Sequence, residues 1–487
     1  MNETPATASL PGDADVPLVI DLDGTLLRCD TLHESALRLL AEKPWTVLQW
    51  PGWLLKGKAH LKREIAARVD LDVATLPIHA EVHAWAEACR QEGRSLVLCS
   101  ASDGKYAAQV AAHLGLFEEV IASDGRTNVS AERKADELVR RYGARGFDYA
   151  GNSVDDLPVW AQARNAIVVG AGGRLRDRAA RVATVERHFE PPPVARGTWL
   201  KALRLHQWAK NLLIFLPLLA SHRITEVPLL VATGLAFLAF GLCASSVYIL
   251  NDLMDLPSDR LHSRKRNRPF ASGALSPTTG LVTGALLLVA AFAIGWLVPP
   301  AFNAWLAVYF GLTLYYTFVL KRKILVDALS LAALYTLRIL AGGAAAGIWP
   351  GFWLLALSLF LFLSLAFVKR YSELKSVFDS GGRRSAGRDY RVSDLPLIET
   401  LGVASGFSAV LVVALYINGE SITRLYPHQD IMWLTVPTLL YWIARMWVKA
   451  HRGEMHDDPI VFAVSDGLSL LTGAVFLALT LIAAAPW

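Results

Sequence analysis

The chain has 487 residues, of which 53% are hydrophobic and 19% charged, and its mean hydropathy is +0.35. Soluble domains carry about a quarter charged residues, so this composition excludes a wholly water-soluble protein, a disordered chain, a collagen and a disulfide scaffold. Residues 1–200 hold 24 Lys and Arg against 27 Asp and Glu, whereas residues 201–487 hold 24 against 16. We therefore expect an acidic soluble domain followed by a basic membrane domain.

The N-terminal sequence MNETPATASLPGDADV is polar and contains no apolar stretch, so we expect no signal peptide and a cytoplasmic N-terminal domain. The cysteines form no metal-binding spacing, and three of the four lie in the soluble part, which suits a reducing compartment. The basic residues of the second part lie between apolar stretches, where membrane topology explains them. We therefore expect no nucleic-acid partner.

Short apolar runs alternate with helical patterns through the soluble part. Residues 17–27 predict a strand that ends in carboxylates, and residues 31–92 predict a mostly helical stretch with a tryptophan-rich interruption. Further buried strands are expected at 95–102, 120–125, 147–153 and 166–170. This alternation predicts an α/β domain with a parallel sheet and a ligand site at the carboxyl ends of the strands. The expected boundaries are a soluble domain at 1–190, a proline-rich linker at 191–199 and a membrane domain at 200–487.

The strongest chemical signal of the soluble part is the motif DLDGT, which begins at Asp21 and follows the first predicted strand. A carboxylate that attacks phosphorus needs a metal ion to offset the repulsion between anions, and a second acid to protonate the leaving oxygen. We assign Asp21 as the nucleophile and Asp23 as the acid and base, and both as Mg²⁺ ligands. Ser100 and Lys134 would bind the phosphoryl group, and Asp156 in the sequence GNSVDD would bind Mg²⁺ as well.

Over roughly residues 15–185, these motifs resemble the haloacid-dehalogenase-like (HAD) phosphatase superfamily and occur in the same order. The resemblance implies a Rossmann-like parallel sheet with a small helical cap and a Mg²⁺-dependent phosphatase. The metal motif departs from the pattern, because Asn152 stands where an aspartate is expected. A neutral amide binds Mg²⁺ less strongly than a carboxylate. Two alternatives therefore stay open: a working phosphatase, and a HAD fold kept as a regulatory or assembly module.

The second part predicts an all-α bundle of nine transmembrane helices, because a bilayer span needs about 20 apolar residues. The connections on one side of these spans carry 17 Lys and Arg, and those on the other side carry Arg223 and Arg424 only. The positive-inside rule then predicts a multi-pass protein of the plasma (inner) membrane with its N-terminal domain in the cytoplasm. The spans are expected near 210–220, 227–250, 277–298, 301–319, 324–346, 350–368, 398–417, 430–448 and 460–484.

An acidic cluster follows the second of these spans, in the sequence NDLMDLPSDRLHSRKRNRP. Its aspartates recur every three or four residues, so they share one helical face. Clustered carboxylates at a membrane surface favour a bound cation, and Mg²⁺ that carries a diphosphate is the simplest candidate. An ordinary solvated loop would explain the basic residues but not the acidic ones. We assign Asp252 and Asp255 as catalytic, Asp252, Asp255 and Asp259 as Mg²⁺ ligands, and Asn251, Lys265 and Arg268 as substrate contacts.

The pattern NDxxDxxxDxxxxxKxxRP resembles the first aspartate motif of the UbiA-type intramembrane prenyltransferase superfamily, and the resemblance covers roughly residues 198–487. It implies a helical bundle around a cavity open to lipid. Aromatic prenyltransferases of that superfamily carry a second aspartate motif after the sixth span, where this chain has Lys369 and Arg370. This difference favours a direct anion site. The segments HQWAKNLLIFLP, YTFVLKRKILVDA, LYTLRILAGG and VKRYSEL resemble the decaprenyl-phosphate phosphoribosyltransferase branch.

That branch implies phosphoribosyl diphosphate as the donor and a polyprenyl phosphate as the acceptor. Arg338 lies inside a predicted span, where a charge that faces lipid would cost several kcal/mol, so we expect it to face the cavity or to pair with an acid. The expected substrate-binding residues of the membrane part, besides those of the aspartate motif, are Lys210, Tyr316, Lys321, Arg338, Lys369, Arg370, Glu373 and Tyr390.

We therefore expect a Mg²⁺-dependent membrane enzyme that transfers phosphoribose to a polyprenyl phosphate, with a cytoplasmic domain that dephosphorylates the product. The rival interpretation is a prenyltransferase that joins a polyprenyl diphosphate to an aromatic acceptor, with a non-catalytic HAD domain. The prenyl chain length, the HAD substrate and the oligomeric state, a homo-oligomer included, stay open.

Overall fold

The computed structural model describes residues 16–170, 172–191, 195–262, 265–384, 388–419, 422, 425–455 and 458–485. They form two compact units. The first unit combines residues 1–202 with residues 249–282, and the second combines residues 203–248 with residues 283–487.

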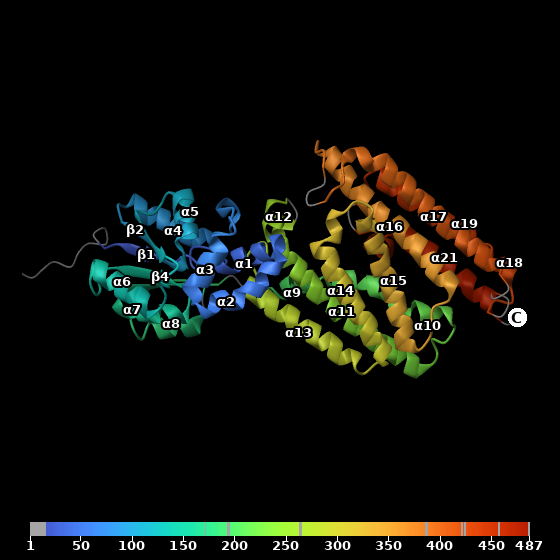
Figure 1. Cartoon of the computed structure of the whole chain (residues 1–487), viewed down its shortest axis with the longest axis horizontal. Coiled ribbons are helices and arrows are strands. Elements are labelled where there is room, and N and C mark those ends of the chain that lie inside the picture. The colour runs from blue at the N-terminus through green and yellow to red at the C-terminus, as the bar shows by residue number, and fades with distance from the viewer. Residues whose placement is uncertain are drawn as a thin grey trace, which may run out of the picture. The chain divides into compact units, whose positions relative to one another are not determined.

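The first unit is built around a six-stranded parallel sheet with the strand order β3-β2-β1-β4-β5-β6 (Figure 1). Strand β1 lies in the middle of the sheet, and its three residues, LVI, are fully buried. The chain continues to opposite sides of β1, so the carboxyl ends of β1, β2 and β4 meet at the switch point where such sheets bind ligands. The strands are β1 (Leu18–Ile20), β2 (Leu96–Asp103), β3 (Glu119–Ser123), β4 (Asp148–Gly151), β5 (Asn165–Val169) and β6 (Thr184–Phe189).

Two apolar cores lie on opposite faces of this sheet, because successive strand residues point to opposite sides. Leu18 and Ile20 join the core beneath α4 and α5, whereas Val19 joins the core beneath α6, α7 and α8. Figure 1 shows the two helix groups on either side of the strands. The expected α/β fold is therefore confirmed. These helices are α4 (Ala80–Gln91), α5 (Gly104–Leu114), α6 (Glu132–Tyr142), α7 (Leu157–Gln162) and α8 (Gly173–Ala179).

A helical insertion between β1 and β2 forms the small cap, as the pattern of residues 31–92 predicts. Its first helix begins after Asp30, whose carboxylate accepts a hydrogen bond from the His33 backbone N–H. The tryptophan-rich stretch becomes a 3₁₀ helix and a short α-helix. The elements of the insertion are α1 (Thr31–Glu42), η2 (Pro44–Gln49), α2 (Trp50–Leu55), α3 (Lys58–Ala66) and η3 (Val73–Thr75).

The sixth strand, β6, was not predicted from the sequence. It pairs with β5 alone, so it forms an edge of the sheet, and it exposes Glu186 and Arg187. A strand with one exposed face and charged residues lacks the continuous apolar run that marks a buried parallel strand. The predicted linker at 191–199 follows β6 directly, and residues 192–194 of it lie outside the described residues.

Residues 249–282 pack as part of the first unit. They comprise the end of α11 (Val227–Met254), α12 (Leu256–Leu261), η6 (Lys265–Asn267) and the start of α13 (Pro277–Gly295). Arg260 donates to both carboxylate oxygens of Glu34, at 2.6 and 3.1 Å, and to the Ala271 carbonyl oxygen at 3.1 Å. Both charged side chains are buried, and a buried charge is stable only beside its partner. This ion pair therefore fixes the segment after the aspartate motif to helix α1.

The described residues of the second unit form helices and the turns between them, and α15 lies at the centre between α14, α16 and η5. Small residues on α15 allow close packing, and the apolar side chains of α16, α17 and α19 form a continuous core with it. The remaining elements are η5 (Leu205–Phe215), α10 (Leu216–Ala220), α14 (Pro300–Phe318), η7 (Leu320–Arg322), α15 (Val326–Ala346), α16 (Phe352–Asp379), η8 (Val392–Asp394), α17 (Leu395–Ile417), α18 (Gln429–Met432), α19 (Thr435–His451), α20 (Pro459–Ser465) and α21 (Gly467–Ala484), with α9 (Arg196–Leu203) preceding them.

The expected number of nine spans was too high, because seven helices of the described residues are long and apolar enough to cross a bilayer. Residues 210–220 are divided between η5 and α10, and neither element has the length of a span. Residues 301–319 do form a 19-residue helix, α14, but three tyrosines, two threonines and an asparagine reduce its apolar character. The other seven expected spans coincide with candidate spans.

Helix α15 and η5 approach each other closely at Gly342. A Cβ atom built on Gly342 would lie 1.9 Å from the carbonyl oxygen of Ile214. This contact is between backbones, so a side chain could be accommodated only if the two elements moved apart. The close approach places Asn211 of η5 next to Arg338 of α15, whose Nε donates to the Asn211 side-chain oxygen at 3.0 Å.

We predict that Gly342→Ala destabilises the second unit, although alanine normally favours a helix over glycine by about 1 kcal/mol. The overpacking should cost about 1–3 kcal/mol and lower the midpoint temperature of thermal unfolding in detergent. The matched control is Gly311→Ala on α14, where a Cβ atom meets nothing within 4 Å. An unchanged midpoint for Gly342→Ala would contradict the packing described here.

Candidate functional site

The DLDGT motif places Asp21 directly after β1, where it is 7% exposed. One of its oxygens accepts a hydrogen bond from Lys134 Nζ at 2.7 Å, and the Lys134 ammonium also donates to the Tyr149 hydroxyl at 2.8 Å. Burial raises the pKa of Asp21 to about 6, against the lowering effect of Lys134. The predicted nucleophile and the predicted phosphate-binding lysine are therefore in contact.

Asp23 lies two residues further along and accepts hydrogen bonds from the cap and from β2. Its carboxylate receives the Thr31 backbone N–H at 2.8 Å and the Ser102 hydroxyl, and the Thr31 and Ser102 hydroxyls are 2.6 Å apart. Burial and the neighbouring Asp30 carboxylate raise the pKa of Asp23 to about 7. This direction suits a side chain that donates a proton to a leaving oxygen near neutral pH.

Ser100 is fully buried in β2 beside this loop, and its hydroxyl oxygen accepts the Ser102 backbone N–H at 3.0 Å. The sequence interpretation singled out Ser100 and missed Ser102, although both end the same strand. Because Ser102 bonds directly to Asp23, it is the hydroxyl that orients the predicted acid.

Asp156 has a different environment from the one predicted for a magnesium ligand. One carboxylate oxygen accepts the backbone N–H groups of Asn152 and Ser153, each at 3.0 Å, and the other accepts the Tyr149 hydroxyl at 2.8 Å. These donors occupy both oxygens and hold the turn after β4. The role of Asp156 as a magnesium ligand stays a prediction, and Mg²⁺ would have to replace at least one of these donors.

The side chain of Asn152 reaches the motif loop itself, because a Cβ atom built on Gly24 would lie 2.0 Å from the Asn152 amide nitrogen. Within the described residues, no three His, Cys, Asp or Glu side chains gather to form a metal site by themselves. Mg²⁺ commonly needs only one or two carboxylates together with substrate phosphates and water. Asp21, Asp23 and the Asn152 amide fit such a donor set.

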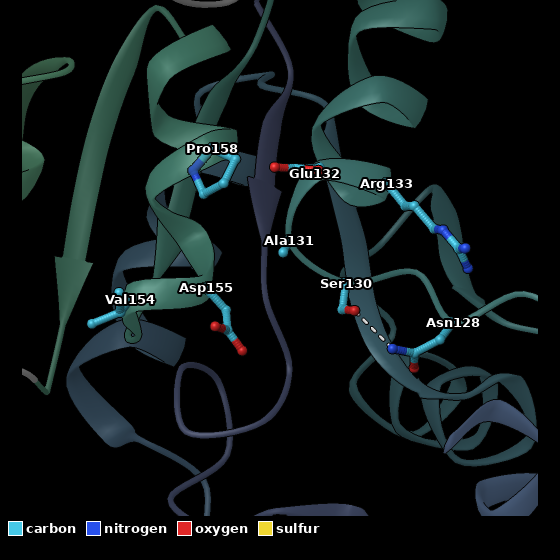
Figure 2. A pocket seen from close by; sticks show the side chains of 8 residues that line it. All are labelled: Asn128, Ser130, Ala131, Glu132, Arg133, Val154, Asp155 and Pro158. Atoms are coloured by element: carbon cyan, nitrogen blue, oxygen red, sulfur yellow. Dashed lines mark hydrogen bonds between the residues drawn. The ribbon is translucent and has the colours of Figure 1, made fainter. Parts of the chain in front are cut away.

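A cavity of about 420 Å³ opens beside this site, between the loop that precedes α6 and the turn that precedes α7 (Figure 2). Lys134 lies on α6, and Asp156 lies in the turn that precedes α7. Figure 2 shows the Asp155 carboxylate directed into the space between them, and the Arg133 side chain directed away from it. The lining residues are Asn128, Ser130, Ala131, Glu132, Arg133, Val154, Asp155 and Pro158.

The aspartate motif of residues 251–259 is a second acidic site in the first unit. Asp252 and Asp259 are each 2% exposed, and Arg268 Nη1 lies 3.0 Å from the first carboxylate and 2.6 Å from the second. Burial raises the pKa of Asp259. The two carboxylates therefore share one cationic partner, the Arg268 guanidinium. Asn251 lies in the last turn of α11, Asp255 is the N-cap residue of α12, and Lys265 is exposed on η6.

In the second unit, Asp458 accepts hydrogen bonds from two of the predicted phosphate-binding lysines. Lys210 Nζ lies 2.7 Å and Lys369 Nζ 2.9 Å from the same carboxylate oxygen, and the Tyr335 hydroxyl lies 3.4 Å from it. Burial opposes ionisation, but the two ammonium groups hold the pKa of Asp458 well below its usual value. Among the described residues, two cations therefore contact this one carboxylate.

Arg338 is 4% exposed and belongs to the same region, since its guanidinium and the Lys210 ammonium both lie over the Tyr335 ring, at 5.6 and 5.8 Å. Its other contacts are to neutral groups: the Asn211 side-chain oxygen at 3.0 Å and the Tyr309 hydroxyl at 3.1 Å. Both expectations for Arg338, that it faces a cavity or that it pairs with an acid, stay predictions. The Asn211 amide nitrogen is buried and has no hydrogen-bond partner within the described part of the chain.

Arg370 belongs to a separate cluster whose charges are balanced. Its Nε lies 2.5 Å from Asp327, and its guanidinium also contacts Glu373, which pairs with Arg388. The Tyr316 hydroxyl donates to Asp327 at 2.8 Å. The Tyr390 hydroxyl accepts the Leu325 backbone N–H at 3.1 Å, and Lys321 is half-buried on η7. Four of the predicted binding residues therefore lie around the buried Asp327: Arg370, Glu373, Tyr316 and Tyr390.

The sequence interpretation missed the acids that hold these cations. Asp458 stands before a proline at the start of α20 and Asp327 in the first turn of α15. Neither position has a spacing that relates it to a lysine or arginine far away in the chain. The available signal was an acidic residue next to an apolar span, which is costly to bury without a partner.

Comparison with known proteins agrees with this organisation. Residues 212–470 match the UbiA prenyltransferase family, and residues 18–160 match the haloacid dehalogenase-like hydrolases. The chain is 35% identical to the protein y4nM of Sinorhizobium fredii over 469 residues, which cover 95% of this chain and 90% of that protein.

Two further relatives resemble about half of the chain. The nodulation protein NoeC of Azorhizobium caulinodans is 38% identical over 278 residues, which cover 56% of this chain and 89% of NoeC. The decaprenyl-phosphate phosphoribosyltransferase of Mycolicibacterium smegmatis is 31% identical over 282 residues, which cover 57% of this chain and 89% of that enzyme. The chain belongs to the UbiA prenyltransferase family and is a multi-pass membrane transferase with an N-terminal haloacid dehalogenase-like domain.

Proposed function

We propose that the membrane domain transfers phosphoribose from phosphoribosyl diphosphate to a polyprenyl phosphate and releases pyrophosphate. The observation that carries this proposal is the surplus of positive charge that the described residues place near Asp458, where Lys210 and Arg338 are buried and Lys369 is partly buried. Buried cations in excess favour an anionic ligand. A relative is named decaprenyl-phosphate phosphoribosyltransferase, which supports the same substrates.

The aspartate motif supplies the complementary surplus of negative charge. Asp252 and Asp259 converge on one guanidinium nitrogen of Arg268, and this pair of carboxylates fits the oxygen ligands that Mg²⁺ prefers. Mg²⁺ bound there would neutralise the charge that develops on a departing diphosphate. Lys265, on the same segment and exposed, would contact that diphosphate directly.

In the transfer step, an oxygen of the lipid phosphate forms a bond to the anomeric carbon of the ribose while the bond from that carbon to the diphosphate breaks. The electron pair leaves with the diphosphate. The phosphate groups are bound by Lys210, Lys369 and Arg338. This binding orients the attacking phosphate oxygen toward the anomeric carbon.

The HAD domain would then remove the ribose phosphate from the lipid product. Asp21 attacks the phosphorus atom, Asp23 protonates the departing ribose oxygen, and water later hydrolyses the aspartyl phosphate with Asp23 as the base. Lys134, bonded to Asp21 at 2.7 Å, offsets the charge of the carboxylate and the phosphate. This reaction would take place on the cytoplasmic side of the plasma membrane. The basic residues in the connections between the spans favour this location of the HAD domain.

We predict that Asp252→Asn lowers the transferase rate by about 10²-fold or more, the size typical of removing one preorganised charge contact. The assay mixes the protein with Mg²⁺, polyprenyl phosphate and labelled phosphoribosyl diphosphate and measures the labelled lipid. Asp379→Asn, at the exposed end of α16, is the control and should leave the rate unchanged. Near-normal turnover of Asp252→Asn in saturating Mg²⁺ would refute the assignment. Prenylation of an aromatic acceptor instead would favour the rival function.

We predict that Lys369→Ala raises the KM for the phosphorylated substrate about 10- to 100-fold, which corresponds to a charge-assisted hydrogen bond of about 1.5–3 kcal/mol. The variant should still fold, because Lys210 remains beside Asp458. Lys375→Ala on the same helix is the matched control, since its partner Asp379 is exposed. By contrast, Arg370→Ala leaves the buried Asp327 carboxylate without its guanidinium partner and should destabilise the protein by about 3–5 kcal/mol. Equal KM values for Lys369→Ala and Lys375→Ala would exclude the anion site.

For the HAD domain, we predict that Asn152→Asp lowers the Mg²⁺ concentration needed for half-maximal phosphate release, because metal affinity rises with ligand charge. Asp21→Asn should abolish that release and leave phosphoribosyl transfer intact. The measurement is inorganic phosphate released from the phosphoribosylated lipid. If wild type and Asn152→Asp both release none at millimolar Mg²⁺, the domain does not hydrolyse this lipid.

A further inference from the structure

The cap of the HAD domain displays an unusual run of large apolar side chains. Trp45 is 82% exposed, Leu48 77% and Leu55 90%, and Leu54 and Val47 are exposed as well. All five lie within η2 and α2. Single exposed apolar residues are common on soluble proteins, but a contiguous group of this kind marks a surface that binds something. We call η2 and α2 together the apolar tip.

The fold holds the apolar tip outward. Trp53, on the opposite side of α2, is buried in a small core with Leu39 and Ile65, and the Arg68 guanidinium lies 4.6 Å from its ring. Trp50 packs against the same core. The tip is therefore anchored to the cap by two tryptophans, while its remaining large side chains face away from the domain.

The charge around the tip is positive. Residues 43–63 contain five Lys and Arg and no Asp or Glu, although residues 1–200 as a whole have more acids than bases. Lys43, Lys56 and Lys58 are exposed at the two ends of the tip. An exposed Trp and Leu surface bordered by lysines is the composition of segments that lie in the interface of an anionic bilayer.

We propose that the apolar tip is an interfacial membrane anchor, which inserts Trp45, Leu48 and Leu55 among the lipid headgroups and acyl chains while the three lysines contact anionic phosphates. A bilayer is always available to it, because the same chain carries seven candidate spans. The charge pattern argues for lipid over a second copy of this chain, whose identical basic tip would repel it.

The anchor has a consequence that rests on the proposed function. Helix α3 follows the tip directly, and its Lys62 donates to the Ala101 carbonyl oxygen at 2.6 Å, between Ser100 and Ser102 of the candidate phosphatase site. A tip seated in the interface would therefore hold this site close to the bilayer surface, where a lipid-linked phosphate is found. The class of substrate favoured is a phosphate ester on a membrane lipid rather than a freely diffusing metabolite.

The test uses the full chain in nanodiscs of phosphatidylcholine and phosphatidylglycerol, with a single cysteine introduced as Leu48→Cys or Leu55→Cys and labelled with an environment-sensitive fluorophore. The four native cysteines are buried, so the label goes to the introduced residue. The matched control is Gln91→Cys, exposed on α4 of the same domain. The measured quantities are the emission maximum and the quenching by spin-labelled lipid, neither of which depends on catalysis.

We expect a blue-shifted emission at positions 48 and 55 and quenching at least about two-fold greater than at position 91, because an interfacial residue lies within reach of the lipid quencher. Replacing phosphatidylglycerol by phosphatidylcholine should reduce the difference. Equal quenching at all three positions would overturn the proposal. A blue shift without lipid quenching would overturn it too, because it would mean that protein, such as a second copy, covers the tip. Either result leaves the phosphatase assay to judge the proposed function separately.

Discussion

Pairs of buried carboxylates and cations set the position of every candidate site in this chain. An ionised group removed from water loses hydration worth several kcal/mol, so it persists only beside a partner of opposite charge. Each pair joins elements that are separated in the sequence, and the contacts that satisfy the charges also fix the local fold. The pairs are Asp21 with Lys134, Asp252 with Arg268, Asp327 with Arg370, and Asp458 with Lys210.

The balance of charge in each cluster then separates structural roles from chemical ones. Around Asp327, the described ion pairs balance, because Arg370 and Arg388 face Asp327 and Glu373. Among the described residues, two lysines contact the single carboxylate of Asp458, whereas two carboxylates of the aspartate motif contact the one guanidinium of Arg268. Lys369 and Arg370 are adjacent in the sequence, yet Lys369 contacts Asp458 and Arg370 contacts Asp327.

Much of the candidate phosphatase site could be predicted from sequence, because local rules determine it. Asp21 and Asp23 follow an apolar strand, and the carboxyl ends of neighbouring parallel strands meet at one edge, so their proximity to Ser100 follows from the strand pattern. The same logic could not find Ser102 or the second role of Asp156. Those depend on which hydroxyl and amide groups the turns direct at each carboxylate, and β6 was missed because its edge position leaves it polar.

The sequence by itself determined the two-part architecture, the order of the functional motifs along the chain and the presence of membrane spans, because hydrophobic periodicity and motif spacing are local properties of a chain. Only the tertiary structure decided which charges meet. Asp458 lies 248 residues from Lys210, and no periodicity connects them. Likewise, Arg260 could be counted as one of the basic residues of a loop, but its burial against Glu34 is a consequence of packing. The sequence shows which residues are charged. Which of them form an ion pair depends on the long-range contacts that bury the two side chains together.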